Sequence, residues 1–313
     1  MRILKSICNH YMRQLKVFVT VIIVIILILI SLLFDKSYFV TSMSMNGSLL
    51  AGDVIIVKTL PAEIERNDII VFKNPLCEKE LLIKRCIAMP GDKIQINNSR
   101  IFINDSIQKL PDNALQLFKI WFKKKEFKNI NILLKSIGAA VYNCGSEQNR
   151  GYFIVNLTRN QNELLNRIAY IDSISWFLQY SEIFYSYDFW QIQNGWTPIN
   201  LGPVIIPGKE QIIPKNAYIP PLCERLIDGF RLNCSKDLDD SSKLKDFQLS
   251  RTEFKSDYYF MMGDNRSFSI DSRYWGLVPG NLFIGKTSLI LLSIDSNEAG
   301  LKKIRWKRIL KKL

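Results

Sequence analysis

The 313-residue sequence contains a single histidine, His10, which lies close to the amino terminus. Chemistry elsewhere in the chain must therefore proceed without imidazole. That excludes Ser-His-Asp hydrolases and most zinc enzymes, because both depend on histidine. We expect neither a metal ion nor a cofactor.

The sequence also lacks the composition of two broad protein classes. Apolar residues make up 48% and charged residues 23%, which fits neither a wholly disordered polyelectrolyte nor a polytopic membrane protein. The 42 Lys and Arg against 29 Asp and Glu give a net charge of +13. No aromatic–basic recognition motif accompanies this excess, so we expect no nucleic-acid partner.

One long apolar run is present, at residues 17–34, and it carries no charge. A helix of about 18–20 such residues spans a bilayer core. The preceding tail, residues 1–16, is basic without any acidic residue, which predicts that it stays in the cytoplasm while the rest of the chain lies outside. A cleaved signal peptide is the alternative, but it would have a shorter apolar core and a small-x-small site, which residues 34–38 do not offer.

Six cysteines leave the disulfide pattern open. Cys8 would face the cytoplasm, and five would face the exterior: Cys77, Cys86, Cys144, Cys223 and Cys234. An odd number leaves at least one unpaired. Cys223 and Cys234 could close a bridge, and five small buried apolar side chains are the alternative.

The carboxyl-terminal tail, residues 297–313, is strongly basic. From Leu301 to Leu313 it holds seven basic residues and no acidic one. Leu301, Ile304, Ile309 and Leu310 could line one face of a short helix. That helix would be either solvated or seated on lipid headgroups.

Short β-branched runs follow the apolar segment and predict strands at 54–57, 69–72 and 81–83. Residues 94–96 and 101–103, joined by a four-residue loop, predict a hairpin. The strand pattern returns at 258–262 and 283–294, so we expect the two β-rich ends to form one sheet system around an insert. Within that insert, Thr158 and Gln161 are placed as a capping box for a helix over 161–180.

Two segments, residues 41–54 and 82–92, carry the candidate chemistry. A serine nucleophile without histidine needs another base, and a lysine can serve if its pKa falls from about 10.4 toward 7–8. Lys84 follows the apolar residues 81–83, whose strand would bury it.

Four segments in a fixed order then resemble the bacterial type I signal peptidases, behind the apolar run. They are Ser44-Met45 with Gly52-Asp53, residues 67–73, Lys84-Arg85 with Pro90-Gly91-Asp92, and residues 261–276. The resemblance implies a mainly β fold, with a signal-peptidase-like β-sheet catalytic domain over 38–106 and 257–296. A large α/β insert, 107–256, would interrupt it, and one transmembrane helix, 17–34, would precede it.

The resemblance also implies roles for individual residues. Ser44 would be the nucleophile and Lys84 the general base. The Ser42 hydroxyl would join the Ser44 N–H in an oxyanion hole, and Ser269 would orient the lysine amine. Asp271 and Arg273 would form a structural ion pair. Residues 263–266 read alone predict only an ordinary β-turn. Gly47 stands where proline is common, which we expect to loosen the turn after the nucleophile.

The implied activity is removal of signal peptides from exported preproteins by a single-pass protein of the cytoplasmic membrane, with its catalytic domain on the outer, periplasmic face. Preproteins and membrane lipid would be its partners. Phe39, Val40, Leu49 and Leu50 flank the nucleophile and would either rest on lipid or pack in the core. The alternatives are a non-enzymatic binding or assembly protein of the same fold, and a peptidase dedicated to a few secretion-system partners. A self-cleaving repressor would need a cytosolic DNA-binding domain, for which the sequence has no room.

Overall fold

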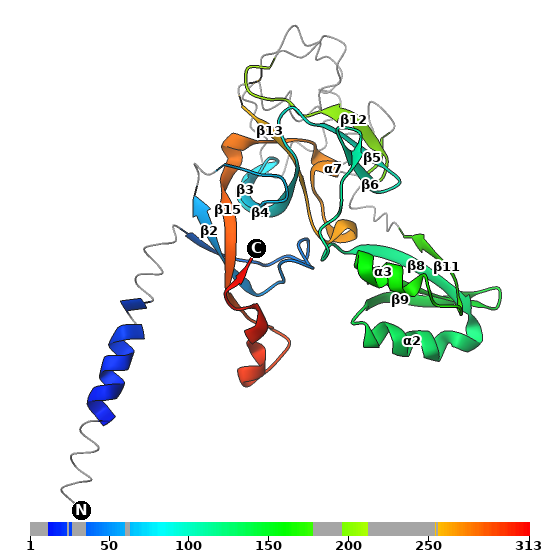
Figure 1. Ribbon diagram of the computed structural model, residues 1–313, viewed down its shortest axis with the longest axis horizontal. Coiled ribbons are helices and arrows are strands. Elements are labelled where there is room, and N and C mark those ends of the chain that lie inside the picture. Colours follow the sequence, from blue (N-terminus) through cyan, green and yellow to red (C-terminus); the bar gives the residue numbers. More distant parts are fainter. Residues whose placement is uncertain are drawn as a thin grey trace, which may run out of the picture.

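A computed structural model describes residues 12–23, 25–26, 36–59, 63–177, 196–211, 254 and 256–313. Residues 12–23 and 25–26 are helical and stand apart from the β-rich body (Figure 1). No helix in the described ranges combines the length and apolarity needed to cross a membrane. The predicted anchor, 17–34, lies partly outside these ranges.

The fold is mainly β, as predicted, and its largest sheet unites both ends of the sequence. Among the described residues the strand order is β1-β2-β15-β3-β4-β13-β14, with β16 paired to β15. The strands are β1 (Lys36–Phe39), β2 (Asp53–Thr59), β3 (Ile69–Asn74), β4 (Cys77–Ala88), β13 (Tyr258–Met262), β14 (Val278–Pro279), β15 (Phe283–Ser293) and β16 (Lys311–Lys312). β15 lies between β2 and β3 and pairs with both. The carboxyl-terminal β-rich segment and the amino-terminal one therefore form a single sheet, as the strand pattern predicted.

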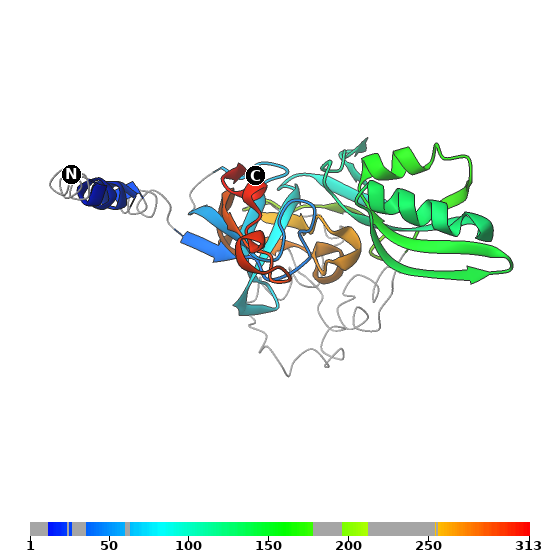
Figure 2. The same ribbon diagram turned by 90° about the horizontal axis from the view of Figure 1, so that it is seen from below.

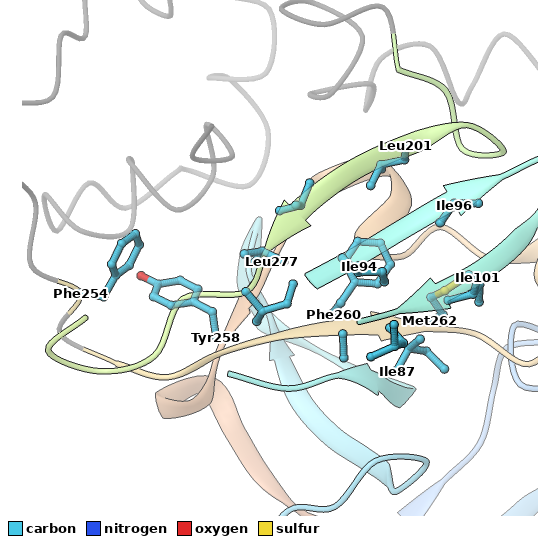
Figure 3. Packing of buried hydrophobic residues seen from close by; sticks show 14 residues of the cluster. Ile87, Ile94, Ile96, Ile101, Leu201, Phe254, Tyr258, Phe260, Met262 and Leu277 are labelled. Atoms are coloured by element: carbon cyan, nitrogen blue, oxygen red, sulfur yellow. The ribbon is translucent and has the colours of Figure 1, made fainter. Parts of the chain in front are cut away.

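A second sheet has the order β12-β5-β6-β7. Its strands are β5 (Lys93–Asn97), β6 (Arg100–Ile103), β7 (Ser106–Ile107) and β12 (Leu201–Ile205). The predicted hairpin forms, but Asn98 and Ser99 alone make its turn, both with positive φ, so the loop is shorter than predicted. The sheet packs on β13 through a cluster that includes Ile94, Phe260 and Leu277 (Figure 3).

The third sheet, β11-β8-β10-β9, forms a lobe beside the others (Figure 2). It comprises β8 (Gln116–Lys123), β9 (Ala140–Glu147), β10 (Arg150–Leu157) and β11 (Ile171–Trp176), and it buries one face against α2 (Phe127–Ser136) and α3 (Arg159–Leu165). A short 3-10 turn, η1 (Lys124–Glu126), precedes α2.

The helix predicted over 161–180 is wrong in length. Thr158 and Gln161 do form the capping box, but α3 ends at Leu165. Residues 171–176 instead form β11, which pairs with β8 and so meets its backbone hydrogen-bonding needs in a sheet. Residues 178–180 lie outside the described ranges.

The prediction for the carboxyl-terminal tail is also wrong. It forms two 3-10 turns, η5 (Gly300–Lys303) and η6 (Trp306–Arg308), and then β16, in place of an α-helix. Ile304 makes a β-bridge to Ile294, and Arg308 binds the buried carboxylate of Asp53. These contacts attach the tail to the main sheet, so neither a solvated nor a lipid-bound helix describes it.

The cysteines differ in state. Cys77 is disulfide-bonded, whereas Cys86 and Cys144 are free. The proposed pair Cys223 and Cys234, and Cys8 as well, lie outside the described ranges. Cys86 is fully buried, as the small-apolar interpretation expected, but Cys144 is exposed.

Candidate active site

The turn over residues 44–48 holds Ser44 between the main sheet and the loop that follows β13. Met45 and Leu49 are buried in the core cluster with Val57 and Val71, which fixes the turn on both sides of the serine. Gly47 has a φ of +107°, and a Cβ there would overlap the carbonyl oxygen of Asn113. Only glycine fits, so Gly47 makes this turn closely packed, and the expectation that it loosens the turn is wrong.

Lys84 lies on β4, between β3 and β13, and its amine reaches this turn. Its Nζ lies 2.6 Å from Ser44 Oγ, and Lys84 is only 3% exposed. Burial lowers the pKa of the amine from 10.5 to about 8, with Arg273 acting in the same direction and Asp271 and Asp264 opposing it. About a tenth of the amine is therefore neutral at pH 7 and about half at pH 8, and a neutral amine can accept a proton from the hydroxyl.

Ser42 lies on the open side of Ser44. Its hydroxyl is 3.1 Å from Ser44 Oγ, and both Ser42 and Met43 are exposed. Ser44 itself is only 8% exposed, so Ser42 is the member of the pair that faces solvent.

A buried network of ion pairs supports the loop after β13. Arg273 binds Asp271 through Nε and Nη2, each at 2.8 Å, so the predicted ion pair is present in the structure. Asp271 also accepts from the Gly263 N–H and from the Arg273 N–H at the start of α7 (Ser272–Trp275). Both side chains are at least nine-tenths buried, so the pair shapes the loop rather than the surface.

Ser269 is buried in this loop, but its hydroxyl makes no hydrogen bond. The bond to the lysine amine that the resemblance implied is therefore absent from this structure. The loop nevertheless packs closely on the nucleophile. A Cβ at Gly263 would overlap the Ser269 hydroxyl and lie 2.5 Å from the carbonyl oxygen of Ser44.

Sequence reasoning missed the role of Asn265. Its backbone N–H donates to the Ser44 carbonyl oxygen and its side-chain amide donates to that of Met43, each at 3.0 Å. Asn265 in turn accepts from Asn156 on β10 at 2.9 Å. The only available signal was its place in residues 263–266, which predicted a plain turn.

Arg85 is a second missed residue. It binds Asp264 through two nitrogens, at 2.8 and 2.6 Å, and donates to Ser48 Oγ at 2.9 Å. It therefore joins the nucleophile turn to the loop after β13. The sequence signal for Arg85 was its position directly after Lys84. Neighbouring residues on a strand point to opposite faces, so Arg85 had to make contacts different from those of the lysine.

The apolar residues beside the nucleophile were expected either to rest on lipid or to pack in the core, and the structure separates them. Val40 and Leu49 are buried in the core cluster, so contact with lipid is wrong for them. Phe39 is 58% exposed. Within the described ranges, no group of His, Cys, Asp or Glu side chains could hold a metal ion.

Comparison with known proteins identifies the family of the chain. The model of the family "signal peptidase, peptidase S26" matches residues 12–132 and 208–292. Signal peptidase I of Buchnera aphidicola (subsp. Schizaphis graminum) is 28% identical over 285 residues, covering 84% of this chain and 70% of the relative. Signal peptidase I of Aquifex aeolicus is 28% identical over 262 residues, covering 82% and 76%.

The family match covers well over half of the sequence, so the chain belongs to the signal peptidase family, peptidase S26. It is an enzyme, a protease of the type I signal peptidase class.

Proposed function

We propose that this chain is a membrane-anchored serine endopeptidase that uses Ser44 and Lys84 to cleave signal peptides from exported preproteins. The observation that carries the proposal is the 2.6 Å contact between the buried Lys84 amine and the Ser44 hydroxyl, which lies 3.1 Å from the hydroxyl of the exposed Ser42. A buried amine with a pKa of about 8 is suited to general-base work near neutral pH.

In the acylation step, Ser44 Oγ attacks the scissile carbonyl carbon while its proton moves to Lys84 Nζ. The protonated amine then gives that proton to the leaving amino group, which departs with the mature protein. In the second step the neutral amine takes a proton from water as the water oxygen attacks the acyl carbon. The C–O bond to Ser44 then breaks, and the protonated amine returns its proton to Ser44 Oγ. The amine is thus regenerated in each half of the cycle.

The tetrahedral intermediate needs hydrogen-bond donors for its oxyanion. The Ser44 N–H and the Ser42 hydroxyl are our candidates, since Ser42 lies 3.1 Å from the nucleophile on the open side. Loss of one such donor typically costs about 2.7–4 kcal/mol in barrier. We assign Ser269 the role of orienting Lys84, because its buried hydroxyl makes no hydrogen bond in the structure and so remains available to the amine.

We further propose that residues 17–34 anchor the enzyme in the cytoplasmic membrane, with the catalytic domain on the outer face. The support is the uncharged run itself and the basic tail before it. The substrate would lie extended beside the segments around Ser42 and Ile83, as an added strand. Shallow apolar pockets there would accept small side chains such as alanine.

We predict a pH–rate profile controlled by the base. Lys84 must be neutral to act, so log kcat/KM should rise with slope one up to a pH of about 8 and then level off. The rate at pH 6 should be about 100-fold below the plateau. Steady-state cleavage of a peptide spanning a signal-peptide junction measures this. A flat profile between pH 6 and 9 would contradict the assignment.

The test of function is cleavage of a panel of preproteins by the full-length protein in detergent, with each product analysed by mass spectrometry. We expect one cut per preprotein, after a small residue, and no cut by Ser44→Ala at equal concentration. Cleavage of most members indicates a general signal peptidase, and cleavage of one or two indicates a dedicated one. Binding without any cut would favour the non-enzymatic alternative instead.

A further inference from the structure

The peptide unit between Met43 and Ser44 carries two groups with different tasks. Its N–H belongs to Ser44 and is one of the two oxyanion donors proposed above. In the described part of the chain, no group accepts a hydrogen bond from this N–H. The carbonyl oxygen belongs to Met43 and points the opposite way, because the peptide unit is planar and trans. A contact that holds the Met43 oxygen therefore also orients the Ser44 N–H.

Two donors hold the Met43 oxygen. One is the Asn46 N–H, at 3.0 Å, within the turn itself. The other is the side-chain amide of Asn265, also at 3.0 Å, from the loop after β13. A single bond leaves the peptide plane able to tilt, whereas bonds to both lone pairs of the oxygen fix that plane. The Asn265 N–H also binds the Ser44 carbonyl oxygen, so one residue holds the peptide units on both sides of the nucleophile.

The direction of the Asn265 amide follows from these contacts. A carbonyl oxygen only accepts, so Asn265 must turn its nitrogen toward Met43 and its oxygen away. That oxygen accepts from Nδ2 of Asn156, on β10 of the third sheet, at 2.9 Å. Asn156 opposes a rotation of the Asn265 amide, because the rotated form would place two nitrogens against each other at Asn156 and two oxygens against each other at Met43.

Packing within the third sheet does not explain the amide of Asn156. Its neighbours Val155 and Leu157 are buried on the face of the sheet that α2 and α3 cover, and Asn156 points to the opposite face. Its own side-chain oxygen is buried and makes no hydrogen bond among the described residues. A buried polar atom without a partner lowers stability. The contact with Asn265 is what the amide provides.

From this geometry we propose that Asn156 is a positioning residue, through which the third sheet aligns the oxyanion donor beside the nucleophile. Asn156 orients the Asn265 amide, that amide holds the Met43 oxygen, and the Ser44 N–H is aligned as a result. Hydrogen bonds in such a chain also polarise one another, which strengthens the last donor. This role rests on the function proposed above for Ser44 and its N–H. The donor acts when the oxyanion forms, so Asn156 should affect kcat and leave KM nearly unchanged.

Steady-state cleavage of a peptide spanning a signal-peptide junction, by the full-length protein in detergent, tests this role. Asn156→Ala should lower kcat about 10-fold, while KM changes less than about twofold. The pH–rate profile should still level off at a pH of about 8, because Lys84 is untouched. Asn156→Asp keeps the shape of the side chain but removes the donor, so it should lose at least as much in kcat. A kcat within about twofold of the parent value in either variant would overturn the proposal.

A matched control separates alignment from docking of the third sheet. Ser267→Ala removes another contact between this sheet and the same loop, the bond from the Leu117 N–H to Ser267 Oγ at 3.0 Å. It should lower the melting temperature about as much as Asn156→Ala, because each change leaves one polar group without its partner. Its kcat should change less than about twofold. An equal fall in kcat for both variants would show that docking alone matters, and the proposed alignment would be wrong.

A double-mutant cycle tests whether Asn156 acts through Asn265. In the Asn265→Ala background, Asn156→Ala should lower kcat no further, because the chain of hydrogen bonds is already broken. Independent, multiplicative losses would refute the proposal. If Asn265→Ala does not fold, Asn156→Asp and Ser267→Ala still decide.

Cleavage by the parent protein separates this proposal from the proposed function. If the parent cleaves, Ser44→Ala does not, and Asn156→Ala matches the parent, then only the role of Asn156 is wrong. If the parent cleaves no preprotein, or Ser44→Ala cleaves as well as the parent, the proposed function is wrong and the role of Asn156 falls with it.

Discussion

Substitution of Lys84 by methionine should abolish preprotein cleavage, with a loss of at least about 10³-fold in kcat. Methionine has nearly the length of lysine but carries no amine, so Ser44 loses the one group among the described residues that lies within 2.6 Å and can take its proton. Lys84→Arg should be equally inactive, because a guanidinium stays protonated. Single-turnover cleavage of a preprotein measures both variants.

The fold should survive this change, which makes the loss of activity informative. A pKa of about 8 in place of 10.5 means that burying the charged amine costs ~3 kcal/mol at pH 7. The unfolded chain binds more protons between pH 8 and 10.5, so this part of the stability rises with pH in that window. Lys84→Met should therefore be at least as stable as the parent at pH 7 and lose that rise.

A matched control is available in the same sheet. Lys58→Met removes an exposed strand lysine and should change the cleavage rate less than twofold. Cleavage by Lys84→Met at the rate of the control would exclude the proposed base.

The second large effect concerns the tail. Arg308→Met should destabilise the protein by about 3–5 kcal/mol, because it leaves the Asp53 carboxylate buried and without its cation. In the structure Arg308 binds both Asp53 oxygens, at 3.2 and 2.5 Å, and donates to the Ser48 carbonyl oxygen at 2.9 Å. Burial would raise the pKa of Asp53, but hydrogen bonds from Arg308, the Leu50 N–H and Ser293 outweigh it and hold the pKa below its usual value.

Urea unfolding measures this loss, and two further variants interpret it. Lys307→Met removes the adjacent exposed charge and should cost less than about 0.5 kcal/mol. The double variant Asp53→Asn with Arg308→Met should recover part of the stability, because the unpaired charge is gone. Equal effects of Arg308→Met and Lys307→Met would show that the Asp53 contact contributes nothing.

The sequence predicted the strands well because their β-branched runs are local signals. Residues 258–262 match β13, and the predicted strand at 283–294 differs from β15 by one residue. The α3 boundary failed because the apolar spacing from 161 onward fits a helix as well as a strand. Pairing of residues 171–176 with β8, some fifty residues earlier, decided between them.

In the candidate site, too, residues marked by local sequence signals could be predicted, whereas residues defined by long-range contacts could not. Ser44 and Lys84 could be named from motif order and from the apolar residues before the lysine. Asn265 could not, because its contact with Met43 joins positions 222 apart in the chain. The tail was misjudged because periodicity ignores the single contacts, such as Arg308 with Asp53, that attach it to the sheet.

The attachment of residues 305–308 to the segment after Ser44 has a consequence for the purified enzyme. Arg305 donates to the Ala51 carbonyl oxygen and Arg308 to that of Ser48, so residues far along the chain support the turn that carries Ser44. Proteolytic clipping just before residue 305 would leave Ser44 and Lys84 in place but remove these two contacts, and it would thus disturb the catalytic turn from outside the site.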